Sequence, residues 1–342
     1  MQSKLGVMII GPGWVAEEHI KAYLNNPHTE LKVIAGVLEE DRNRAKEYME
    51  KHSFRCDYTD NYCKALGRDD IDLVSICTIN SLHYEQSLAC VQAGKHILTE
   101  KPLAFSLQEV NKLVEESKQR KVKTHVGHVA RFYGAIQSLN DVIRQGAVGE
   151  IFYGECDYWH EITGDWKGKI KTGGSSLLMG GVHAVDMLRY LMGEEKEVQQ
   201  VFAYSKEAVR RKDFEYHPTI VLLVKFKDGS IGKIGSSLEC NMPYVFHVQI
   251  CGTKGTIRNK KIYISEGPKK TDKFSLVKDD YPDDWNVSHH PFPEEIDYFV
   301  DCILKDHPSE LSFENTYPTY EIIFAAQEST RTGKPVDLPL EL

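Results

Sequence analysis

The sequence lacks the long apolar runs and paired cysteines that mark several classes of protein. No apolar stretch reaches the roughly 18 residues that a membrane-spanning helix needs. The first residues, Met1 to Lys4, lead directly into a strand-like segment and do not resemble a signal peptide. The eight cysteines are scattered without a Cys-x-x-Cys pair, which favours reduced and mostly buried thiols. We therefore expect a cytoplasmic protein that has no membrane partner.

An excess of positive charge is also absent. The chain carries 42 Lys and Arg against 50 Asp and Glu, and its formal net charge of -8 at pH 7 opposes binding to nucleic acid or anionic lipid. We expect no metal site, because His125 and His128 are three residues apart on a predicted strand and so face opposite sides. A small molecule is the expected partner.

The 342 residues exceed the usual single-domain length of about 100 to 150, and their first part alternates strands with helices. Residues 106–109 form a Ser-x-x-Glu capping box, which predicts the start of a helix. This order predicts a Rossmann domain, a doubly wound parallel sheet, over residues 1–127, with ligands at the carboxyl ends of its strands. The predicted strands are residues 5–10, 31–38, 71–77, 96–99 and 122–128.

A glycine-rich turn joins the first strand to the first helix. Gly11 and Gly13 begin a Gly-x-Gly-x-x-Ala motif, and Trp14 and Val15 open the helix that follows. Such a turn allows close backbone approach to a pyrophosphate, which the amides of the helix N-terminus can bind. A plain strand-to-helix turn is the alternative, but an acidic residue, Glu39, ends the second strand. This combination predicts dinucleotide binding.

The charge near the second strand bears on which dinucleotide binds. The Glu39 carboxylate suits the ribose hydroxyls of NAD and would repel the 2'-phosphate of NADP. Arg42 and Arg44 could instead pair with that phosphate. We expect NAD, with NADP as the less favoured cofactor.

Strand patterns dominate from Glu150 onward, and an Asp-Gly hairpin signal lies at residues 227–230. A helix over 183–192 and a pair of helices near the C-terminus, over 293–304 and 318–332, accompany these strands. Residues 128–342 are therefore predicted to form an α+β domain with an open, mostly antiparallel sheet. The loop over 267–293 allows no assignment.

Five segments spread along the chain carry a further signal: residues 11–16, 78–83, 93–102, 173–186 and 329–336. Together they resemble the glucose-fructose oxidoreductase, inositol dehydrogenase and MocA (Gfo/Idh/MocA) family. The resemblance implies a Rossmann domain joined to an open-faced sheet domain, and an oxidoreductase that acts on hydroxyl groups of sugars or cyclitols. It also implies a homodimer or homotetramer.

Oxidation of a secondary alcohol needs a hydride acceptor and a group that takes the hydroxyl proton. Lys101 is predicted at the carboxyl end of a strand, where its cation could orient the hydroxyl. His183 heads a predicted helix, and a spacing of three, four and seven residues puts it on a polar stripe that faces away from the core. The resemblance assigns catalytic roles to both residues.

Position 179 departs from the family, which commonly places an aspartate four residues before the histidine. Met179 cannot transfer a proton. His183 could act with Lys101 alone, or Glu161 or Asp165 could substitute. Relatives that use NAD for redox-neutral glycoside cleavage, or that keep the fold for regulation, supply the alternative functions.

Further site residues are predicted on both parts of the chain. Asp186 could orient His183 or hold a substrate hydroxyl, and a salt bridge is the alternative. Aromatic and polar residues after the strand at 151–157 suit stacking on sugar rings, and a core at the edge of the sheet is the alternative. The candidate cofactor-binding residues also include Thr78, Asn80, His83, Glu100 and Lys101, and the candidate substrate-binding residues are Lys101, His160, Trp166, His183 and Asp186.

Overall fold

The computed structural model describes residues 4–277, 285 and 289–341, and the chain forms two compact units. The first unit contains Met1–His128 and Pro291–Tyr317, and the second contains Val129–His290 and Pro318–Leu342. The sequence predicted a single second domain over residues 128–342. The structure instead groups Pro291–Tyr317 with the first unit, because helix α9 (Phe292–Leu304) packs on helix α1 (Trp14–Asn25).

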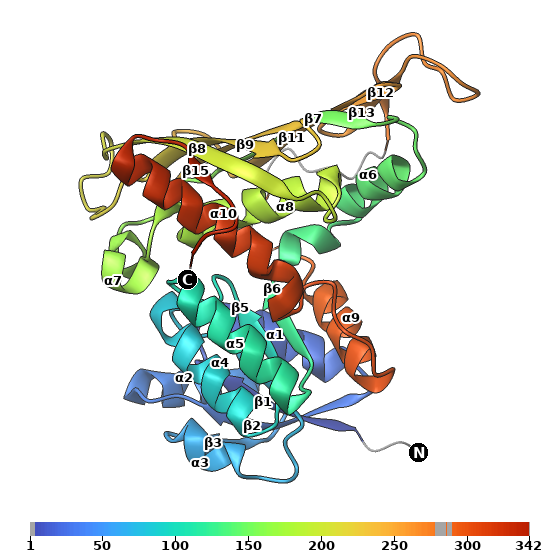
Figure 1. Ribbon diagram of the computed structural model, residues 1–342. Coiled ribbons are helices and arrows are strands. Elements are labelled where there is room, and N and C mark those ends of the chain that lie inside the picture. Colours follow the sequence, from blue (N-terminus) through green and yellow to red (C-terminus); the bar gives the residue numbers. More distant parts are fainter. Residues whose placement is uncertain (1–3, 278–284, 286–288, 342) are drawn as a thin grey trace. The chain divides into compact units, whose positions relative to one another are not determined.

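The first unit is built around a six-stranded parallel sheet in the order β3-β2-β1-β4-β5-β6 (Figure 1). This confirms the Rossmann prediction. Strand order reverses between β1 and β4, and ligands of such sheets bind at this switch point, outside the carboxyl ends of the strands. The strands are β1 (Leu5–Ile10), β2 (Thr29–Ala35), β3 (Asp57–Thr59), β4 (Leu73–Ile76), β5 (His96–Glu100) and β6 (Thr124–Gly127).

Helices of the first unit bury one apolar face each. In α1 the buried residues Ala16, His19, Ile20 and Tyr23 recur at helical spacing, and one of them is a histidine. The predicted capping box is confirmed, since Ser106 caps α5. The other helices of this unit are α2 (Glu39–Lys51), α3 (Tyr62–Leu66), α4 (His83–Gln92) and α5 (Leu107–Arg120).

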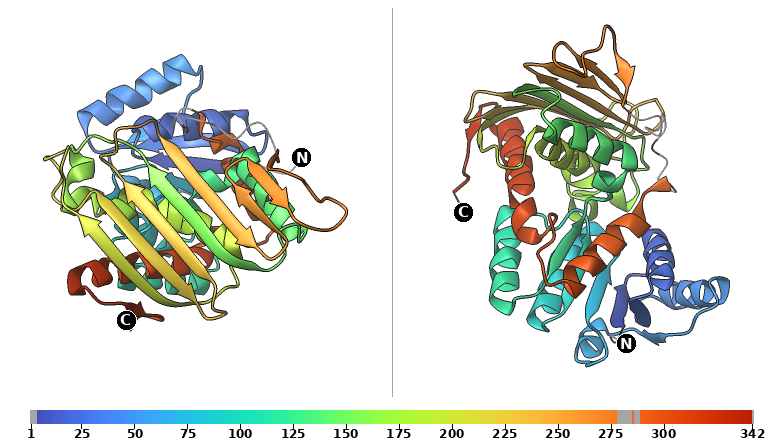
Figure 2. Two further views of the ribbon diagram at one scale, coloured as in Figure 1. Left: turned by 90° about the horizontal axis from the view of Figure 1, so that it is seen from above. Right: turned by 90° about the vertical axis from the view of Figure 1, so that its right-hand side faces the viewer.

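The second unit contains a nine-stranded sheet in the order β14-β13-β12-β11-β7-β10-β9-β8-β15 (Figure 2). Its pairs are antiparallel except for β7 with β10, which confirms the mostly antiparallel prediction. The predicted hairpin at residues 227–230 forms, with Gly229 at a φ of +86°. The strands are β7 (Ile151–Trp159), β8 (Val198–Lys206), β9 (Thr219–Phe226), β10 (Ile231–Ser237), β11 (Val245–Gly252), β12 (Gly255–Arg258), β13 (Lys261–Ile264), β14 (Ser275–Leu276) and β15 (Val336–Asp337).

Helix α8 (Val182–Met192) packs against strands β7 and β10 and against helix α6 (Gly134–Arg144). The last helix, α10 (Phe313–Thr332), begins five residues earlier than the sequence indicated, because Ser312 accepts a hydrogen bond from the amide of Asn315. Pro318 lies inside this helix. The unit also has a short helix α7 (Ile170–Gly173) and a π-helical turn over Leu177–Gly181. Within the described residues, no helix has both the length and the apolarity to cross a bilayer.

Candidate active site

The glycine-rich turn of the first unit has the geometry that a dinucleotide requires. Gly11 has a φ of +83°, and a Cβ atom there would lie 2.4 Å from Cγ2 of Thr78. A Cβ atom on Gly13 would lie 3.7 Å from the carbonyl oxygen of Cys77. The loops after β1 and β4 therefore lie close together at two residues that have no side chain, beside the start of α1 at Trp14. These residues fit a pyrophosphate at the helix N-terminus.

Glu39 is the first residue of α2 and is exposed, so its carboxylate can reach a ligand at the end of β2. The two nearby arginines have other partners. The Arg42 guanidinium lies over the ring of Tyr58 at 4.9 Å, and Arg44 pairs with Asp41 at 3.9 Å. This arrangement favours NAD over its 2'-phosphorylated form.

The predicted residues after β4 differ in their burial and in their hydrogen bonds to the rest of the unit. Thr78 donates through Oγ1 to Gln86 at 2.6 Å, and Asn80 is buried. The ring nitrogens of His83 lie 2.7 Å from the carbonyl oxygen of Pro102 and 3.0 Å from that of Thr78. Burial lowers the pKa of His83, against the opposing effect of these carbonyl contacts. His83 thus links the loop after β4 to the segment that contains Lys101.

Lys101 is half-buried and directly follows Glu100, the last residue of β5. Glu100 is buried, and its Oε1 lies 3.2 Å from Nε2 of His19. Burial would raise the pKa of Glu100, but the hydrogen bond from His19 and the positive charges of His19 and Lys101 lower it below the usual value. A carboxylate therefore precedes the Lys101 cation at the carboxyl end of the sheet.

His183 occupies the first turn of α8 in the second unit, as predicted, but not on an exposed stripe. His183, Asp186 and Met187 are all buried, because the helix is covered by the sheet on one side and by α6 on another. The prediction that His183 faces away from the core is therefore wrong. Its ring stacks on Tyr158 with the centroids 6.1 Å apart and lies edge-on to Phe246 at 6.2 Å.

The end of β7 brings one predicted substrate residue into the neighbourhood of His183. The hydroxyl of Tyr158 lies 2.8 Å from Nδ1 of His160, and the His160 ring stacks on Tyr244 at 4.1 Å. Burial raises the pKa of Tyr158, which keeps its hydroxyl protonated and able to donate. Trp166 lies further along, half-buried in a short turn over Trp166–Gly168, and the Lys167 ammonium sits 5.8 Å from its ring centroid.

Asp186 forms a salt bridge, which the sequence offered as the alternative to a role in the site. Its carboxylate accepts hydrogen bonds from Nε and Nη2 of Arg131 at 2.6 and 2.7 Å. Arg131 also contacts Glu194 at 2.8 Å and lies over the Tyr190 ring at 4.6 Å. The pair is buried, so the salt bridge lies inside the unit and not on a helix surface.

The possible substitutes for an aspartate at position 179 are engaged in other contacts. Met179 lies in the π-helical turn before α8 and is 9% exposed. Glu161 pairs with Arg210 at 3.3 Å. Asp165 accepts from the amide of Lys167 at 3.2 Å. Neither contact directs these carboxylates toward His183.

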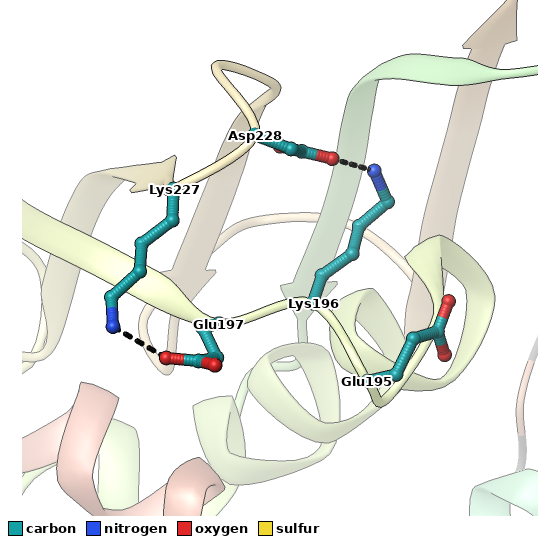
Figure 3. Close-up of a pocket in the computed structure, with 5 residues that line it drawn as sticks. All are labelled: Glu195, Lys196, Glu197, Lys227 and Asp228. Atoms are coloured by element: carbon teal, nitrogen blue, oxygen red, sulfur yellow. Dashed lines mark hydrogen bonds and ion pairs between the residues drawn. The ribbon is translucent and has the colours of Figure 1, made fainter.

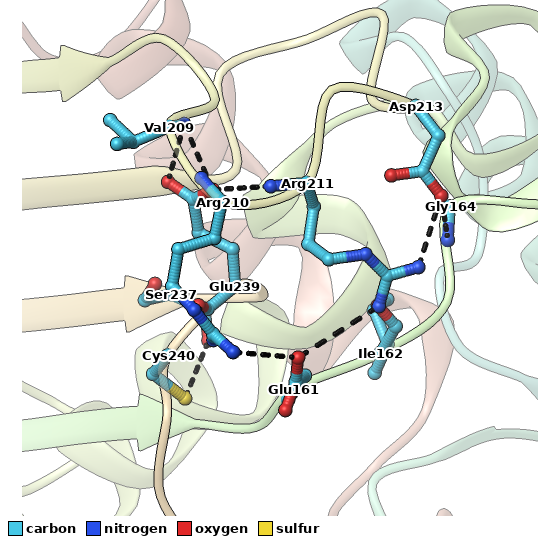
Figure 4. Close-up of polar contacts among 10 residues, drawn as sticks. All are labelled: Glu161, Ile162, Gly164, Val209, Arg210, Arg211, Asp213, Ser237, Glu239 and Cys240. Carbon is cyan, nitrogen blue, oxygen red and sulfur yellow. Dashed lines mark hydrogen bonds and ion pairs between the residues drawn. The ribbon is translucent and has the colours of Figure 1, made fainter.

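Figure 4 shows how the segment after β7 is fixed by the loop before β9. Glu239 is buried, and its carboxylate accepts hydrogen bonds from the amides of residues 209–211 at 2.8 to 3.2 Å. Arg211 from this loop donates to the carbonyl oxygen of Ile162 at 3.0 Å, and Asp213 accepts from the amide of Gly164 at 2.9 Å. The stretch between His160 and Trp166 is thereby tied to a second loop.

A hollow on the second unit has a different character (Figure 3). It is lined by Glu195, Lys196, Glu197, Lys227 and Asp228, with ion pairs from Lys196 to Asp228 and from Lys227 to Glu197. None of these five residues is a predicted site residue. The described residues contain no cluster of three side chains suited to hold a metal ion.

Three residues that contact predicted site residues were not themselves predicted from the sequence. Tyr244 carried no local signal, because its approach to His160 depends on the antiparallel pairing of β11 with β7. Arg131 likewise meets Asp186 only through the fold. His19 did carry a signal, since it falls among the apolar positions of α1.

Comparison with known proteins accounts for nearly the whole chain. Residues 5–128 match the model of an oxidoreductase family with an NAD-binding Rossmann fold, and residues 140–338 match that family's C-terminal alpha/beta domain. The chain is 25% identical to myo-inositol 2-dehydrogenase of Thermotoga maritima over 350 residues, which cover 96% of this chain and 97% of the relative.

Levoglucosan dehydrogenase of Pseudarthrobacter phenanthrenivorans is 26% identical over 284 residues, covering 74% of this chain and 73% of the relative. A solved structure of levoglucosan dehydrogenase in complex with NADH superimposes with a TM-score of 0.86 at 24% identity, covering 98% of this chain and all of that one. The two family models together span most of the sequence. The chain therefore belongs to the Gfo/Idh/MocA family of NAD-binding oxidoreductases.

Proposed function

We propose that this protein is an NAD-dependent dehydrogenase that oxidises a secondary hydroxyl of a sugar, glycoside or cyclitol, or reduces the corresponding ketone. The observation that carries the proposal is the placement of Lys101 at the carboxyl end of β5, in the sheet whose glycine-rich turn fits a dinucleotide. Relatives named as myo-inositol and levoglucosan dehydrogenases support the substrate class.

In the proposed reaction Lys101 binds the substrate hydroxyl. Its ammonium donates a hydrogen bond to the oxygen and stabilises the negative charge that develops there as the proton leaves. NAD, when bound, would supply the hydride acceptor for the carbon that bears this oxygen. Gly11, Gly13, Trp14 and Val15 would hold the pyrophosphate, and Glu39 the adenosine ribose. We assign Thr78, Asn80, His83 and Glu100 to the nicotinamide side of this cofactor site.

His183 is the proposed proton acceptor. An imidazole nitrogen can both accept and return a proton, which suits exchange of the hydroxyl proton in both directions. The buried aromatic surroundings of His183 limit its contact with water. The His160 and Trp166 side chains would contact the substrate ring, with His160 held by Tyr158 and Tyr244.

We also propose that the protein is a homodimer or homotetramer that associates through the uncovered face of the nine-stranded sheet. Val221 and Leu223 of β9 and Ile231 of β10 are 39%, 50% and 47% exposed, and the strand register places them on one face. Apolar patches of this kind favour protein association. Light scattering of Leu223→Lys should give a smaller species than the parent protein; an unchanged mass would refute this interface.

A second candidate function rests on Met179. A thioether before His183 cannot relay a proton, which favours a protein that binds NAD without net oxidation. Such a protein would be a regulator, or a glycosidase in which the cofactor is reduced and then reoxidised. Cleavage of aryl glycosides without accumulation of NADH would support the glycosidase, whereas NADH binding without turnover of any substrate would support the regulator.

The direct test is to incubate the protein with NAD and a panel of sugars, glycosides and inositols while NADH absorbance is followed. The proposal predicts turnover of at least one of them and its loss by about 10²–10⁴-fold in Lys101→Ala and His183→Ala. Lys212→Ala, in an exposed loop, is the control and should leave the rate unchanged. Undiminished turnover in Lys101→Ala would show that the proposed mechanism is wrong.

A further inference from the structure

We propose that His19 and Glu100 form a buried positioning pair that fixes the backbone and the charge environment of Lys101. The proposal rests on the proposed function, in which Lys101 binds the substrate hydroxyl. His19 and Glu100 would not themselves touch the substrate. They would act through Lys101.

The contacts of His19 join three elements of the first unit. His19 is fully buried on α1, with Nε2 3.2 Å from Oε1 of Glu100 on β5 and Nδ1 2.8 Å from Oγ of Ser75 on β4. Phe292, at the start of α9, packs on its ring at 5.4 Å. Because these contacts fix the His19 ring, its hydrogen bond also fixes the position of the Glu100 carboxylate.

The strand next to β5 leaves room for that carboxylate. Glu100 is paired with Gly127 of β6, and a Cβ atom at position 127 would lie 3.2 Å from both Cδ and Oε1 of Glu100. Any side chain there would press on the carboxylate. On the other side of Lys101, the carbonyl oxygen of Pro102 accepts a hydrogen bond from His83 at 2.7 Å. The segment from residue 100 to residue 102 is therefore anchored at both ends.

The charges within this network compensate one another. Burial alone would lower the pKa of His19, but interactions with Cys77 and with Glu100 outweigh it and raise the pKa well above the usual value. The groups that face Glu100 are His19, Lys101 and His83. A cationic His19 beside the Glu100 carboxylate thus reduces the net negative charge that faces the Lys101 ammonium.

Removing either partner should therefore change the proton affinity of Lys101 in opposite directions. In His19→Gln the Glu100 charge acts on Lys101 without compensation, which raises the pKa of Lys101. In Glu100→Gln the carboxylate that attracts the Lys101 ammonium is lost, which lowers the pKa of Lys101. An inert structural role predicts no such pair of opposite shifts.

The chain offers a closely matched control. His125 is also fully buried, with Nδ1 2.8 Å from Oγ of Ser309 and Nε2 3.2 Å from Oε1 of Glu295. These contacts repeat those of His19 in kind and distance, but Glu295 lies on α9 and not beside Lys101. His125→Gln therefore reproduces the loss of a buried histidine–glutamate pair without touching the Lys101 segment.

The first experiment does not require turnover. The full-length protein and its variants are labelled with trace acetic anhydride over a range of pH, and the acetylation of Lys101 is quantified by mass spectrometry. We expect severalfold slower labelling at fixed pH in His19→Gln, severalfold faster labelling in Glu100→Gln, and no change in His125→Gln. Equal rates in all four proteins, or a change of the same sign in both site variants, would overturn the proposal.

The second experiment measures steady-state kinetics on any substrate that the panel identifies. His19→Gln should lower kcat by about tenfold or more while the Kd for NADH stays within about twofold of the parent value, because only the reacting end of the site is disturbed. His125→Gln should retain the parent kcat. A parallel loss of kcat in both histidine variants would mean that His19 is merely structural.

Ser75→Ala retains both residues of the His19–Glu100 pair and removes the anchor at Nδ1 of His19, so it replaces His19→Gln if that variant does not fold. Ser75→Ala should slow the labelling of Lys101, as His19→Gln does, but by less. Unchanged labelling would count against the proposal. If the parent protein turns over no substrate but the labelling shifts are seen, the proposed function fails and the positioning pair stands. If the parent is active and the shifts are missing, only the positioning pair fails.

Discussion

Arg131→Met would remove the cation that binds Asp186 and Glu194 inside the second unit. The variant leaves the Asp186 carboxylate 1% exposed, without the guanidinium that donates to both of its oxygens. Breaking a buried ion pair by removing one partner costs about 3–5 kcal/mol. We expect the free energy of unfolding of this unit to fall by that amount, because the methionine fills the space but donates no hydrogen bonds to the buried carboxylate.

Urea unfolding followed by tryptophan fluorescence measures this loss, since Trp159, Trp166 and Trp285 all belong to the second unit. Arg331→Met is the matched control. It breaks an arginine–glutamate pair of the same unit whose side chains are 72% and 41% exposed, and exposed pairs contribute about 1 kcal/mol or less.

The double variant Arg131→Met with Asp186→Leu separates the two contributions to the loss. It removes the buried carboxylate as well, so most of the stability should return. Equal destabilisation by Arg131→Met and Arg331→Met would refute the reasoning. So would a double variant that is no more stable than Arg131→Met alone.

Three further predictions concern the first unit. Gly11→Ala should raise the Kd for NADH at least about fivefold in a fluorescence titration, because its φ of +83° and the 2.4 Å approach to a threonine methyl both disfavour a side chain. Gly94→Ala is the control, since Gly94 has a φ of +73° and open space around it. It should lower the free energy of unfolding and leave the Kd for NADH unchanged. Glu39→Gln should lower the preference for NADH over NADPH by about tenfold, measured as a ratio of the two Kd values, and an unchanged ratio would argue against a ribose contact. The folded-state pKa of His19 is raised above its unfolded value of about 6.5. The contribution of His19 to stability is therefore complete below the unfolded pKa and is lost as pH rises through the folded pKa. The free energy of unfolding should fall with pH over this range, and less steeply in His19→Gln.

The fold was largely predictable because its main signals are local. Strand and helix periodicities before residue 128, the capping box at Ser106 and the Asp-Gly hairpin all depend on residues close in sequence. The assignment of Pro291–Tyr317 to the first unit was not predictable, since it depends on which surface the apolar face of α9 covers. The start of α10 was not predicted, because a proline such as Pro318 is typical of a helix start. The helix in fact begins at Phe313, where Ser312 caps it.

The candidate site was predictable where a motif specifies the backbone, and less so where side chains meet through the sheet. The approach of Gly11 to Thr78 follows from the switch point of a Rossmann sheet. The helical periodicity of α8 suggested an exposed polar stripe, but the helix lies between a sheet and another helix, so His183 and Asp186 are buried. The Arg131 partner of Asp186 and the stacking of Tyr244 on His160 depend on long-range packing that no short spacing reveals.

The most direct test of the central claim is the initial rate of NAD reduction by the parent protein, Lys101→Ala and Lys212→Ala across the panel of sugars, glycosides and inositols. The account predicts that the parent and Lys212→Ala reduce NAD with at least one member at equal rates, and that Lys101→Ala binds NADH but turns over at least about a hundredfold more slowly. Turnover that survives in Lys101→Ala would contradict the account.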